Sequence, residues 1–381
     1  MKRAILVTGA TGFLGSHLVP ELVKNDFKVL CLLRSRKGKS TIDRLRESLK
    51  IACNEPGEVD DVASQIDIIE GDIGLENFGL NEKEHSALRD AAEYIFHCAA
   101  QTSFSSDVET EQWKINVEGT EKLARFACMG KLFKGFHYIS TAYVAGDRDG
   151  IVREDELDEG QGFYNGYEKS KCAAEKMLRG YCQKNGLNLT VYRPSIIVGD
   201  SNSGRTTLFN GVLLLLRFLH TTKKSFQNSQ KQGKVVISIR GIANLEATKN
   251  YVHIDYVIKM IMTILMRPES HGKTYHITHD NPPKIGLIKE VIEDLLGITG
   301  MQYFDEKTFQ QIQPNELESL LNEQIKTYTP YLLGEPSFDK STIKTALSHN
   351  EIPQCPPMDR KALEKLFSYA IKSQWGKRKN V

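Results

Sequence analysis

The stretch GATGFLG, from Gly9 to Gly15, decides the fold of this chain. An apolar run, Ala4 to Val7, precedes it, and a helix-like stretch from Ser16 to Lys24 follows. A strand, a glycine turn and a helix N-terminus in this order predict a site for the pyrophosphate of a dinucleotide. Glycine permits the tight turn and close backbone approach, and the unpaired N–H groups and positive dipole of the helix end attract phosphate. A GxxGxxG spelling alone is weak evidence, so its position between strand and helix carries the argument.

A tyrosine and a lysine four residues apart, Tyr167 and Lys171, form the second signal. Residues i and i+4 share one face of a helix, so Lys171 is expected beside Tyr167. Upstream, an apolar run ends in the hydroxyl residues Ser140 and Thr141. Such tyrosine and lysine pairs are often surface packing. Here the pair lies between a hydroxyl-bearing strand end and the segment Tyr192 to Pro194, which favours a site that moves a hydride and a proton.

Apolar segments alternate with helix-like segments along the first two thirds of the chain. Beyond the first strand, the expected strands are Lys28–Leu33, Gln65–Ile69, Tyr94–Cys98, Gly135–Ser140, Leu189–Arg193 and Lys273–Thr278. This rhythm predicts an α/β protein with a Rossmann-type, doubly wound parallel sheet. With 381 residues, a smaller and mainly helical C-terminal substrate-binding lobe is also expected. We expect the nucleotide-binding domain at 1–200, with a return segment at about 248–278, and the substrate lobe at 201–381.

Composition excludes several classes of function. The 50 basic residues nearly balance the 48 acidic ones, which argues against a nucleic-acid binder. Seven cysteines contain no CxxC pair, so neither a metal site nor a disulfide framework is predicted, and a cytoplasmic protein is expected. No apolar stretch approaches the length of a membrane span, and the glycines of the turn interrupt the signal-like N-terminal run.

At these residues the chain resembles the extended short-chain dehydrogenase/reductase family, and more closely its thioester reductase and fatty acyl-CoA reductase branch, the male-sterility type. The matching segments are Thr8–Gly15, Arg34 with Asp43–Leu45, Glu70–Ile73, Phe96–Ala100, Asn116–Thr120, Ser140–Thr141, Tyr167 with Lys171, and Tyr192–Pro194 with Gly199. The resemblance is dense from Met1 to about His276 and thins afterwards.

The resemblance implies a nicotinamide cofactor. The residues expected to hold it are Gly9, Thr11, Gly12, Phe13, Leu14, Gly15, Arg34, Arg44, Asp72, Ile73, Ala99, Ala100, Lys171, Pro194 and Ile197. The small side chains of Ala99 and Ala100 would let the cofactor lie against the sheet. Asp72 matches the family residue at the adenine edge, although a turn carboxylate would look the same.

The identity of the cofactor follows from the residues after the second strand. NAD enzymes of this fold usually place an acid there, whereas this chain has Arg34, with Arg44 as the second candidate. A guanidinium forks onto phosphate oxygens and stacks on adenine, so NADP(H) is predicted. The alternative is an exposed basic loop.

The resemblance also assigns catalytic roles. Tyr167 would donate a proton to the carbonyl oxygen, and the positive charges of Lys171 and the oxidised nicotinamide would favour its phenolate. Lys171 would also bind the nicotinamide ribose. Either Ser140 or Thr141 could face the site, and comparison with the family over Ala142 to Gly146 selects Thr141.

The branch implies reduction of an acyl thioester, delivered on coenzyme A or a carrier protein, to an aldehyde or further to an alcohol. The chain shows no adenylation or carrier module, so the acyl group would arrive already activated. The leucine-rich segment Leu208 to Leu219 would line an acyl channel, touch a membrane surface as a peripheral contact, or form an ordinary core helix. The alternatives are a ketone, aldehyde or hydroxysteroid reductase, a sugar-nucleotide epimerase or dehydratase, and a non-enzymatic NADP redox sensor.

Overall fold

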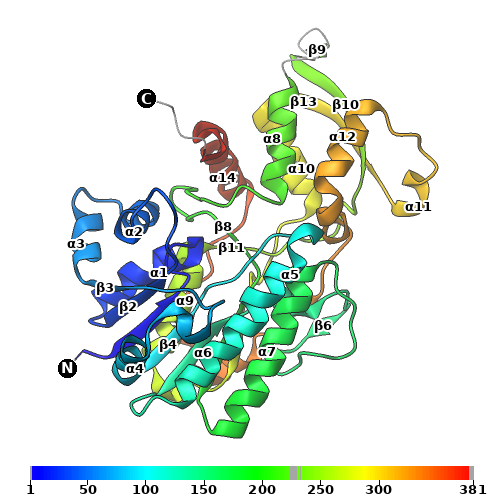
Figure 1. Cartoon of the computed structure of the whole chain (residues 1–381). Coiled ribbons are helices and arrows are strands. Elements are labelled where there is room, and N and C mark those ends of the chain that lie inside the picture. The colour runs from blue at the N-terminus through cyan, green and yellow to red at the C-terminus, as the bar shows by residue number, and fades with distance from the viewer. Residues whose placement is uncertain (1, 224–229, 232, 377–381) are drawn as a thin grey trace. The chain divides into compact units, whose positions relative to one another are not determined.

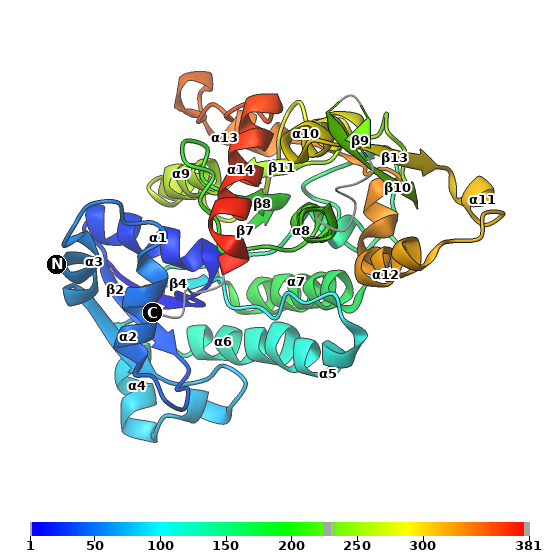
Figure 2. The same ribbon diagram turned by 90° about the horizontal axis from the view of Figure 1, so that it is seen from above.

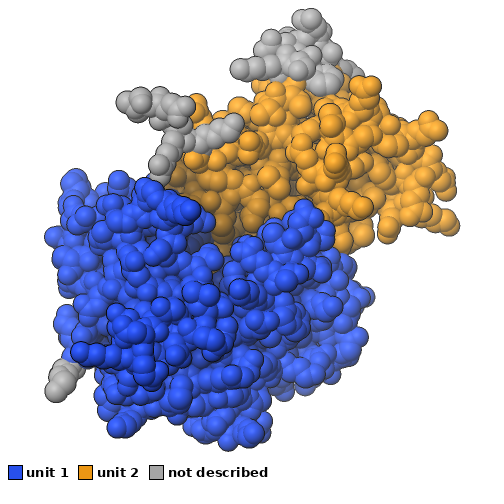
Figure 3. Space-filling view, viewed as in Figure 1, with its two compact units in different colours: residues 1–195, 254–278, 337–354 blue, residues 196–253, 279–336, 355–381 orange. Residues whose placement is uncertain are grey.

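The computed structural model describes residues 2–223, 230–231 and 233–376. The chain forms two compact units, which Figure 3 distinguishes by colour. The first contains residues 1–195, 254–278 and 337–354, and the second contains residues 196–253, 279–336 and 355–381. The sequence prediction put the boundary after residue 200 and the return segment at about 248–278. Contacts put the boundary after Ser195 and the return at Ile254–Thr278, and they add a further return at 337–354.

A seven-stranded sheet is the centre of the first unit. Its strands are β1 (Ala4–Thr8), β2 (Lys28–Leu33), β3 (Ile66–Glu70), β4 (Tyr94–His97), β5 (Gly135–Ile139), β7 (Leu189–Pro194) and β12 (Thr274–Ile277). Their order is β12-β7-β5-β4-β1-β2-β3, and every neighbouring pair is parallel. The predicted doubly wound sheet is therefore confirmed. Strand β1 is buried at all five positions, which fits the apolar run Ala4 to Val7 that forms its first four residues.

Helices cover both faces of this sheet. The helices of the unit are α1 (Phe13–Lys24), α2 (Thr41–Leu49), α3 (Glu58–Ser64), α4 (Glu82–Ala91), α5 (Glu109–Gln112), α6 (Gly119–Cys128), α7 (Gly166–Asn185), α9 (Ile254–Leu265) and α13 (Ser341–Ala346). Helix α1 packs on α9, and α6 packs on α7 on the opposite face (Figures 1 and 2). The core below α6 and α7 contains Leu6, Phe136 and Val191 from the strands and Leu123 and Leu178 from the helices.

The strand order reverses between β1 and β4, since β2 follows on one side and β5 on the other. In open α/β sheets, ligands bind at the carboxyl ends of the strands beside such a reversal. Here β1 ends at Thr8 and β4 at His97, and the two residues are paired across the sheet. The glycine turn and the segment that begins with Cys98 therefore leave the sheet side by side.

The second unit combines helices with small sheets. Its helices are α8 (Val212–Thr222), α10 (Ile285–Leu296), α11 (Glu306–Phe309), α12 (Glu316–Ile325) and α14 (Arg360–Lys372). Three strands, β13 (Ile298–Phe304), β10 (Lys234–Ile242) and β9 (Gln230–Lys231), form one sheet, and β11 (Tyr251–His253) pairs with β8 (Ile196–Val198). In the first unit, the short strands β14 (Ser337–Phe338) and β6 (Ile151–Val152) pair in parallel.

The leucine-rich segment contributes to the core of the second unit. Helix α8 begins at Val212, four residues after the predicted start at Leu208. Leu213, Leu216 and Leu219 are buried in the core that α8 shares with α10 and α14. The sequence left three hypotheses for this segment: an acyl channel, a membrane contact and a core helix. These three side chains pack in a core.

Candidate active site

The glycine turn joins β1 to α1 at the strand-order reversal. Gly9 has φ +76°, and a Cβ on it would lie 2.6 Å from the backbone nitrogen of Ala99. A Cβ on Gly15 would lie 2.2 Å from the carbonyl oxygen of Gly9. Real Cβ atoms do not approach so closely, so glycine is required at both positions. The turn is held by the Gly12 N–H, which donates to the Gly9 carbonyl at 2.9 Å.

The N-terminus of α1 fits an anionic group. Helix α1 begins at Phe13, and its N-cap, Gly12, makes no side-chain hydrogen bond to the first turn. The first turn contains no acidic residue. Backbone N–H groups at a helix start and the positive end of its dipole are thus available to a phosphate, without a carboxylate to oppose it. Ala99 and Ala100, which follow β4, are half-buried beside this turn.

A basic cluster follows β2. Arg34 is exposed directly after the buried Leu33, and Arg44 on α2 donates a hydrogen bond to the carbonyl oxygen of Arg34. Partial burial and the charges of Arg36 and Arg34 lower the pKa of Arg44. The three cations are therefore close enough to repel one another, and an anion between them would relieve this repulsion.

The other expected cofactor residues lie in different environments. Asp72 Oδ1 accepts the Gly74 N–H at 2.8 Å, which is an Asx-type turn, and Ile73 is buried in the core. Pro194 is buried at the carboxyl end of β7. Ile197 belongs to β8 in the second unit, whereas the other cofactor candidates belong to the first.

Helix α7 places the tyrosine and the lysine. Asn165 caps it, because its side chain accepts the Glu168 N–H at 3.0 Å, so that Tyr167 falls in the first turn and Lys171 one turn later. The Tyr167 side chain hydrogen-bonds the Thr141 side chain at the end of β5. The ring of Phe104 stacks on Tyr167 with a centroid distance of 5.9 Å.

The two adjacent hydroxyl residues after β5 have separate partners. Ser140 donates to Glu175 Oε2 at 2.6 Å, and both side chains are buried. The Thr141 side chain is hydrogen-bonded to Tyr167, and its hydroxyl oxygen accepts the Tyr143 N–H at 3.2 Å. Of the two hydroxyls that the sequence left open, Thr141 is therefore the one beside the tyrosine, and Ser140 is turned toward a buried carboxylate.

That carboxylate belongs to a buried ionic cluster behind the site. Glu175 accepts from Arg193 Nη2 at 2.7 Å and from Arg179 Nε at 3.0 Å, and the side chains of Glu175 and Arg193 are fully buried. Burial raises the pKa of Glu175, but the charge and hydrogen bonds of Arg193, with help from Arg179 and Ser140, hold it at about 2. Glu175 is therefore a permanent anion at neutral pH, one helical turn beyond Lys171.

Burial dominates the titration of both catalytic candidates. It raises the pKa of Tyr167 to about 12, although the Thr141 hydrogen bond lowers it. It lowers the pKa of Lys171 to about 7, although the charge of Glu175 raises it. The acidic tyrosine expected from the sequence is therefore not a property of these side chains alone. One reason is geometric, since the Lys171 ammonium donates to Tyr138 and to the Ile139 carbonyl.

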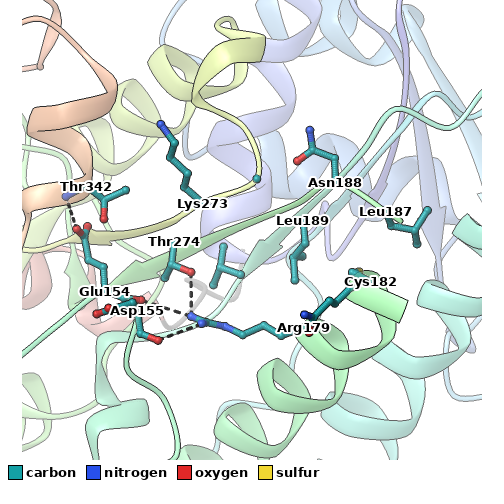
Figure 4. A pocket seen from close by; sticks show the side chains of 13 residues that line it. Glu154, Asp155, Arg179, Cys182, Leu187, Asn188, Leu189, Lys273, Thr274 and Thr342 are labelled. Atoms are coloured by element: carbon teal, nitrogen blue, oxygen red, sulfur yellow. Dashed lines mark hydrogen bonds between the residues drawn. The ribbon is translucent and has the colours of Figure 1, made fainter. Parts of the chain in front are cut away.

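A pocket of about 460 Å³ lies elsewhere in the first unit (Figure 4). Residues at the amino ends of β7 and β12, such as Leu189 and Thr274, line it, whereas Thr141 follows the carboxyl end of β5. Arg179 at its wall donates to Glu175, to the Thr274 hydroxyl and to backbone carbonyls at residues 154 and 155. All three guanidinium nitrogens donate hydrogen bonds within the protein, so this arginine has a structural role.

Comparison with known proteins decides the family. Residues 7–261 match the NAD-binding family described as "Male sterility protein". The chain belongs to this family. It is thus an extended short-chain dehydrogenase/reductase, an oxidoreductase with a nicotinamide dinucleotide as cofactor, as the sequence predicted. The glycine turn fits such a dinucleotide, as does the start of α1, where no side chain caps the backbone N–H groups.

The relatives of this family member include parts of large biosynthetic proteins. The nonribosomal peptide synthetase asaC of Aspergillus flavus is 30% identical over 314 residues, which are 77% of this chain and 28% of that protein. The L-2-aminoadipate reductase large subunit of Candida glabrata is 26% identical over 309 residues, 76% of this chain and 21% of that protein. The terminal R domain from the myxalamid PKS-NRPS biosynthetic pathway superposes with a TM-score of 0.80 at 26% identity, covering 98% of this chain and 92% of that domain.

Within the part of this family member that the structure describes, every helix is too short or too polar to cross a bilayer. Over the same residues, histidine, cysteine, aspartate and glutamate side chains form no group of three or more that could hold a metal ion.

Sequence reasoning missed two residues of the site in this family member. Glu175 could have been found, because it continues the i+4 series from Tyr167 through Lys171 on one face of α7. Tyr138 could not, because nothing in the apolar strand around it indicates that its hydroxyl meets the lysine of another element.

Proposed function

We propose that this chain reduces acyl groups bound as thioesters to coenzyme A or a carrier protein, with NADPH, and releases an aldehyde. One observation supports this most directly. Thr141 at the end of β5 hydrogen-bonds Tyr167 in the first turn of α7, and Lys171 follows one turn later, in a family member whose relatives include an aminoadipate reductase. A redox sensor would need the glycine turn but not the three side chains.

The reaction places one requirement on the protein at the carbonyl oxygen. When bound, the reduced nicotinamide supplies a hydride to the thioester carbonyl carbon, and the oxygen gains negative charge. Thr141 and Tyr167 meet that charge with two hydroxyl groups. Tyr167 transfers its proton to the oxygen and becomes a phenolate. The high pKa of Tyr167 in the protein alone means that the proton is held until the oxygen is basic enough to take it.

The second half of the reaction needs the same groups in reverse. The resulting hemithioacetal loses its hydroxyl proton to the Tyr167 phenolate, the C–S bond breaks, and the thiol sulfur takes a proton from solvent. One acyl thioester, one NADPH and one proton thus give an aldehyde, a free thiol and NADP⁺. The ammonium form of Lys171, one helical turn from Tyr167 on α7, stabilises the transient phenolate through its charge.

The cofactor preference and the source of the acyl group are parts of the same proposal. Arg34, Arg36 and Arg44 form a cationic cluster after β2, which suits a 2′-phosphate better than a ribose hydroxyl. The relative asaC is a nonribosomal peptide synthetase and the myxalamid R domain is a terminal domain of a PKS-NRPS pathway, so a carrier-protein thioester is the substrate that we favour over a coenzyme A thioester.

Turnover of a substrate panel tests the proposed function. Purified protein is supplied with NADPH or NADH and with acyl-coenzyme A thioesters, acyl pantetheine on a carrier protein, matching aldehydes, ketones and a sugar nucleotide. Loss of NADPH absorbance and aldehyde formation with thioesters, abolished in Tyr167→Phe, is the expected result. Turnover of ketones or the sugar nucleotide without turnover of any thioester would replace this function with one of the alternatives.

A further inference from the structure

The hydrogen bonds of Lys171 are almost fully used inside the protein. Its Nζ donates to Tyr138 Oη at 2.7 Å and to the Ile139 carbonyl oxygen at 2.7 Å. It also lies 4.1 Å from the centroid of the Tyr138 ring. An ammonium has three N–H groups, so these two acceptors leave one N–H for other partners. Tyr138 and Lys171 are both buried, so water does not supply a substitute acceptor.

The direction of the Tyr138 hydroxyl follows from its other partner, Thr120. Thr120 Oγ1 donates its single proton to the Asn116 carbonyl at 2.6 Å. Its oxygen can therefore only accept from its other neighbours, which are the Tyr138 hydroxyl and His97 Nε2, the latter at 2.9 Å. Tyr138 thus points its O–H at Thr120 and turns its lone pairs toward Lys171.

The far end of this chain of hydrogen bonds is also fixed. Because Thr120 must accept from His97, the imidazole carries its proton on Nε2 and accepts at Nδ1, where the Thr8 hydroxyl lies at 2.6 Å. Burial, with a smaller effect of the Lys171 charge, lowers the pKa of His97 to about 3, so the ring stays neutral. The hydroxyl groups of Thr8, Thr120 and Tyr138 therefore each have one orientation.

Other groups around Lys171 cannot replace Tyr138 as an acceptor. The titratable groups that act on Lys171 are His97 and Cys98 at the end of β4, Tyr138 on β5, and Glu175 on α7, and Tyr167 lies one turn before the lysine on that helix. Glu175 is the one anion among them, and its oxygens accept from Arg193, Arg179 and Ser140. It acts on the lysine through charge at a distance, whereas Tyr138 makes the direct contact.

We propose that Tyr138 is a positioning residue of this active site, which holds Lys171 as an ammonium and leaves one of its N–H groups for the cofactor ribose. The proposal rests on the proposed function only for the role of Lys171 in binding the cofactor. Thr120 and His97 orient the Tyr138 hydroxyl and contribute through it. Because burial lowers the pKa of Lys171 to about 7, loss of an acceptor at its ammonium changes its charge in the physiological range.

The substitution Tyr138→Phe removes the acceptor and keeps the ring. NADPH affinity, measured by nucleotide fluorescence from pH 5 to pH 9 without any substrate, should fall in the parent protein as Lys171 loses its proton. A hydrogen bond to a charged group changes an equilibrium by about tenfold or more. In Tyr138→Phe the midpoint of this fall should move about one pH unit lower, so that affinity is about tenfold weaker above the midpoint and unchanged below it.

Tyr275→Phe is the matched control. Tyr275 is also a buried tyrosine of the same sheet, but its hydroxyl donates to the Ser270 carbonyl and has no part in the site. It should leave the pH midpoint in place. If Tyr138→Phe and Tyr275→Phe both follow the parent curve, the proposal is wrong.

A second pair of variants covers the case in which Tyr138→Phe does not fold. Thr120→Ser keeps the oxygen that accepts from Tyr138, and Thr120→Val removes it. The proposal expects the shifted midpoint in the valine variant alone, and identical curves for the two variants would overturn it. Because nucleotide binding needs no acyl substrate, this result does not depend on whether thioesters are reduced.

Discussion

Replacing the adjacent hydroxyls Ser140 and Thr141 one at a time should separate stability from catalysis. Ser140→Ala removes a 2.6 Å hydrogen bond to the fully buried, ionised Glu175. Hydrogen bonds to charged groups contribute about 1.5–3 kcal/mol. Because Arg193 and Arg179 continue to hold Glu175, we expect the lower part of this range, about 1.5–2 kcal/mol. For units of this size that is a fall in Tm of roughly 3–8 °C, while most of the turnover remains.

Thr141→Val should have the opposite profile. Its cost to stability is the loss of the 3.2 Å acceptor for the Tyr143 N–H, about 0.5–1.5 kcal/mol. Its cost to catalysis is one of the two hydroxyls at the reacting oxygen, about 10²–10³-fold in kcat. Thr141→Ser is the control that keeps the hydroxyl and should keep most of the activity.

Thermal unfolding and NADPH consumption on the same four proteins give the comparison. If Ser140→Ala shows the loss of about 10²–10³-fold in kcat that is expected of Thr141→Val, while Thr141→Val keeps its turnover, the assignment of the two hydroxyls is reversed. Equal losses of Tm in both variants would show that the hydrogen bond from Ser140 to Glu175 stabilises the fold no more than that from the Tyr143 N–H to Thr141.

Three further predictions concern the cofactor and the core. Arg34→Ala should weaken NADPH binding about tenfold or more while leaving NADH binding nearly unchanged, and equal losses for both nucleotides in a fluorescence titration would rule out a phosphate contact. Gly9→Ala should abolish nucleotide binding and lower stability by about 1–3 kcal/mol, because its Cβ would lie 2.6 Å from a backbone nitrogen, whereas Gly180→Ala on α7, where a Cβ has open space, should be neutral or stabilising by thermal unfolding. His97 has a pKa of about 3 in the folded protein and of about 6.5 when the chain is unfolded. The neutral ring therefore contributes to the free energy of unfolding fully above pH 6.5, and this contribution falls by about 1.4 kcal/mol per pH unit as the pH drops toward 3. Urea midpoints that stay level from pH 6.5 to pH 4 would contradict this.

The first unit could be predicted well because its signals are local. Each strand of the large sheet is a short apolar run bounded by turn residues, and no observed bound differs from the expected one by more than one residue. Helix α1 begins three residues earlier than the expected Ser16, because the glycine turn itself supplies its N-cap at Gly12. The glycine turn and Tyr167 with Lys171 are likewise local patterns.

The remainder depends on contacts between distant segments. Strands β10 and β13 were not predicted, and their parallel pairing joins Val235 to Ile298 across a long separation in sequence. The return of residues 337–354 to the first unit depends on the pairing of β14 with β6 and on hydrogen bonds to distant residues, such as that from the Thr342 N–H to Glu154 Oε2 at 2.7 Å. The contact of Lys171 with Tyr138 on β5 is of the same kind, because no spacing rule links a strand residue to a helix residue 33 positions later.

The most direct test of the central claim is NADPH oxidation with an acyl thioester, followed by identification of the carbonyl product, in the parent protein and in Tyr167→Phe. The account predicts stoichiometric aldehyde and free thiol with the parent protein, and intact NADPH binding with turnover nearly abolished in the variant. Equal turnover by both proteins, or NADPH consumption without release of thiol, would contradict it.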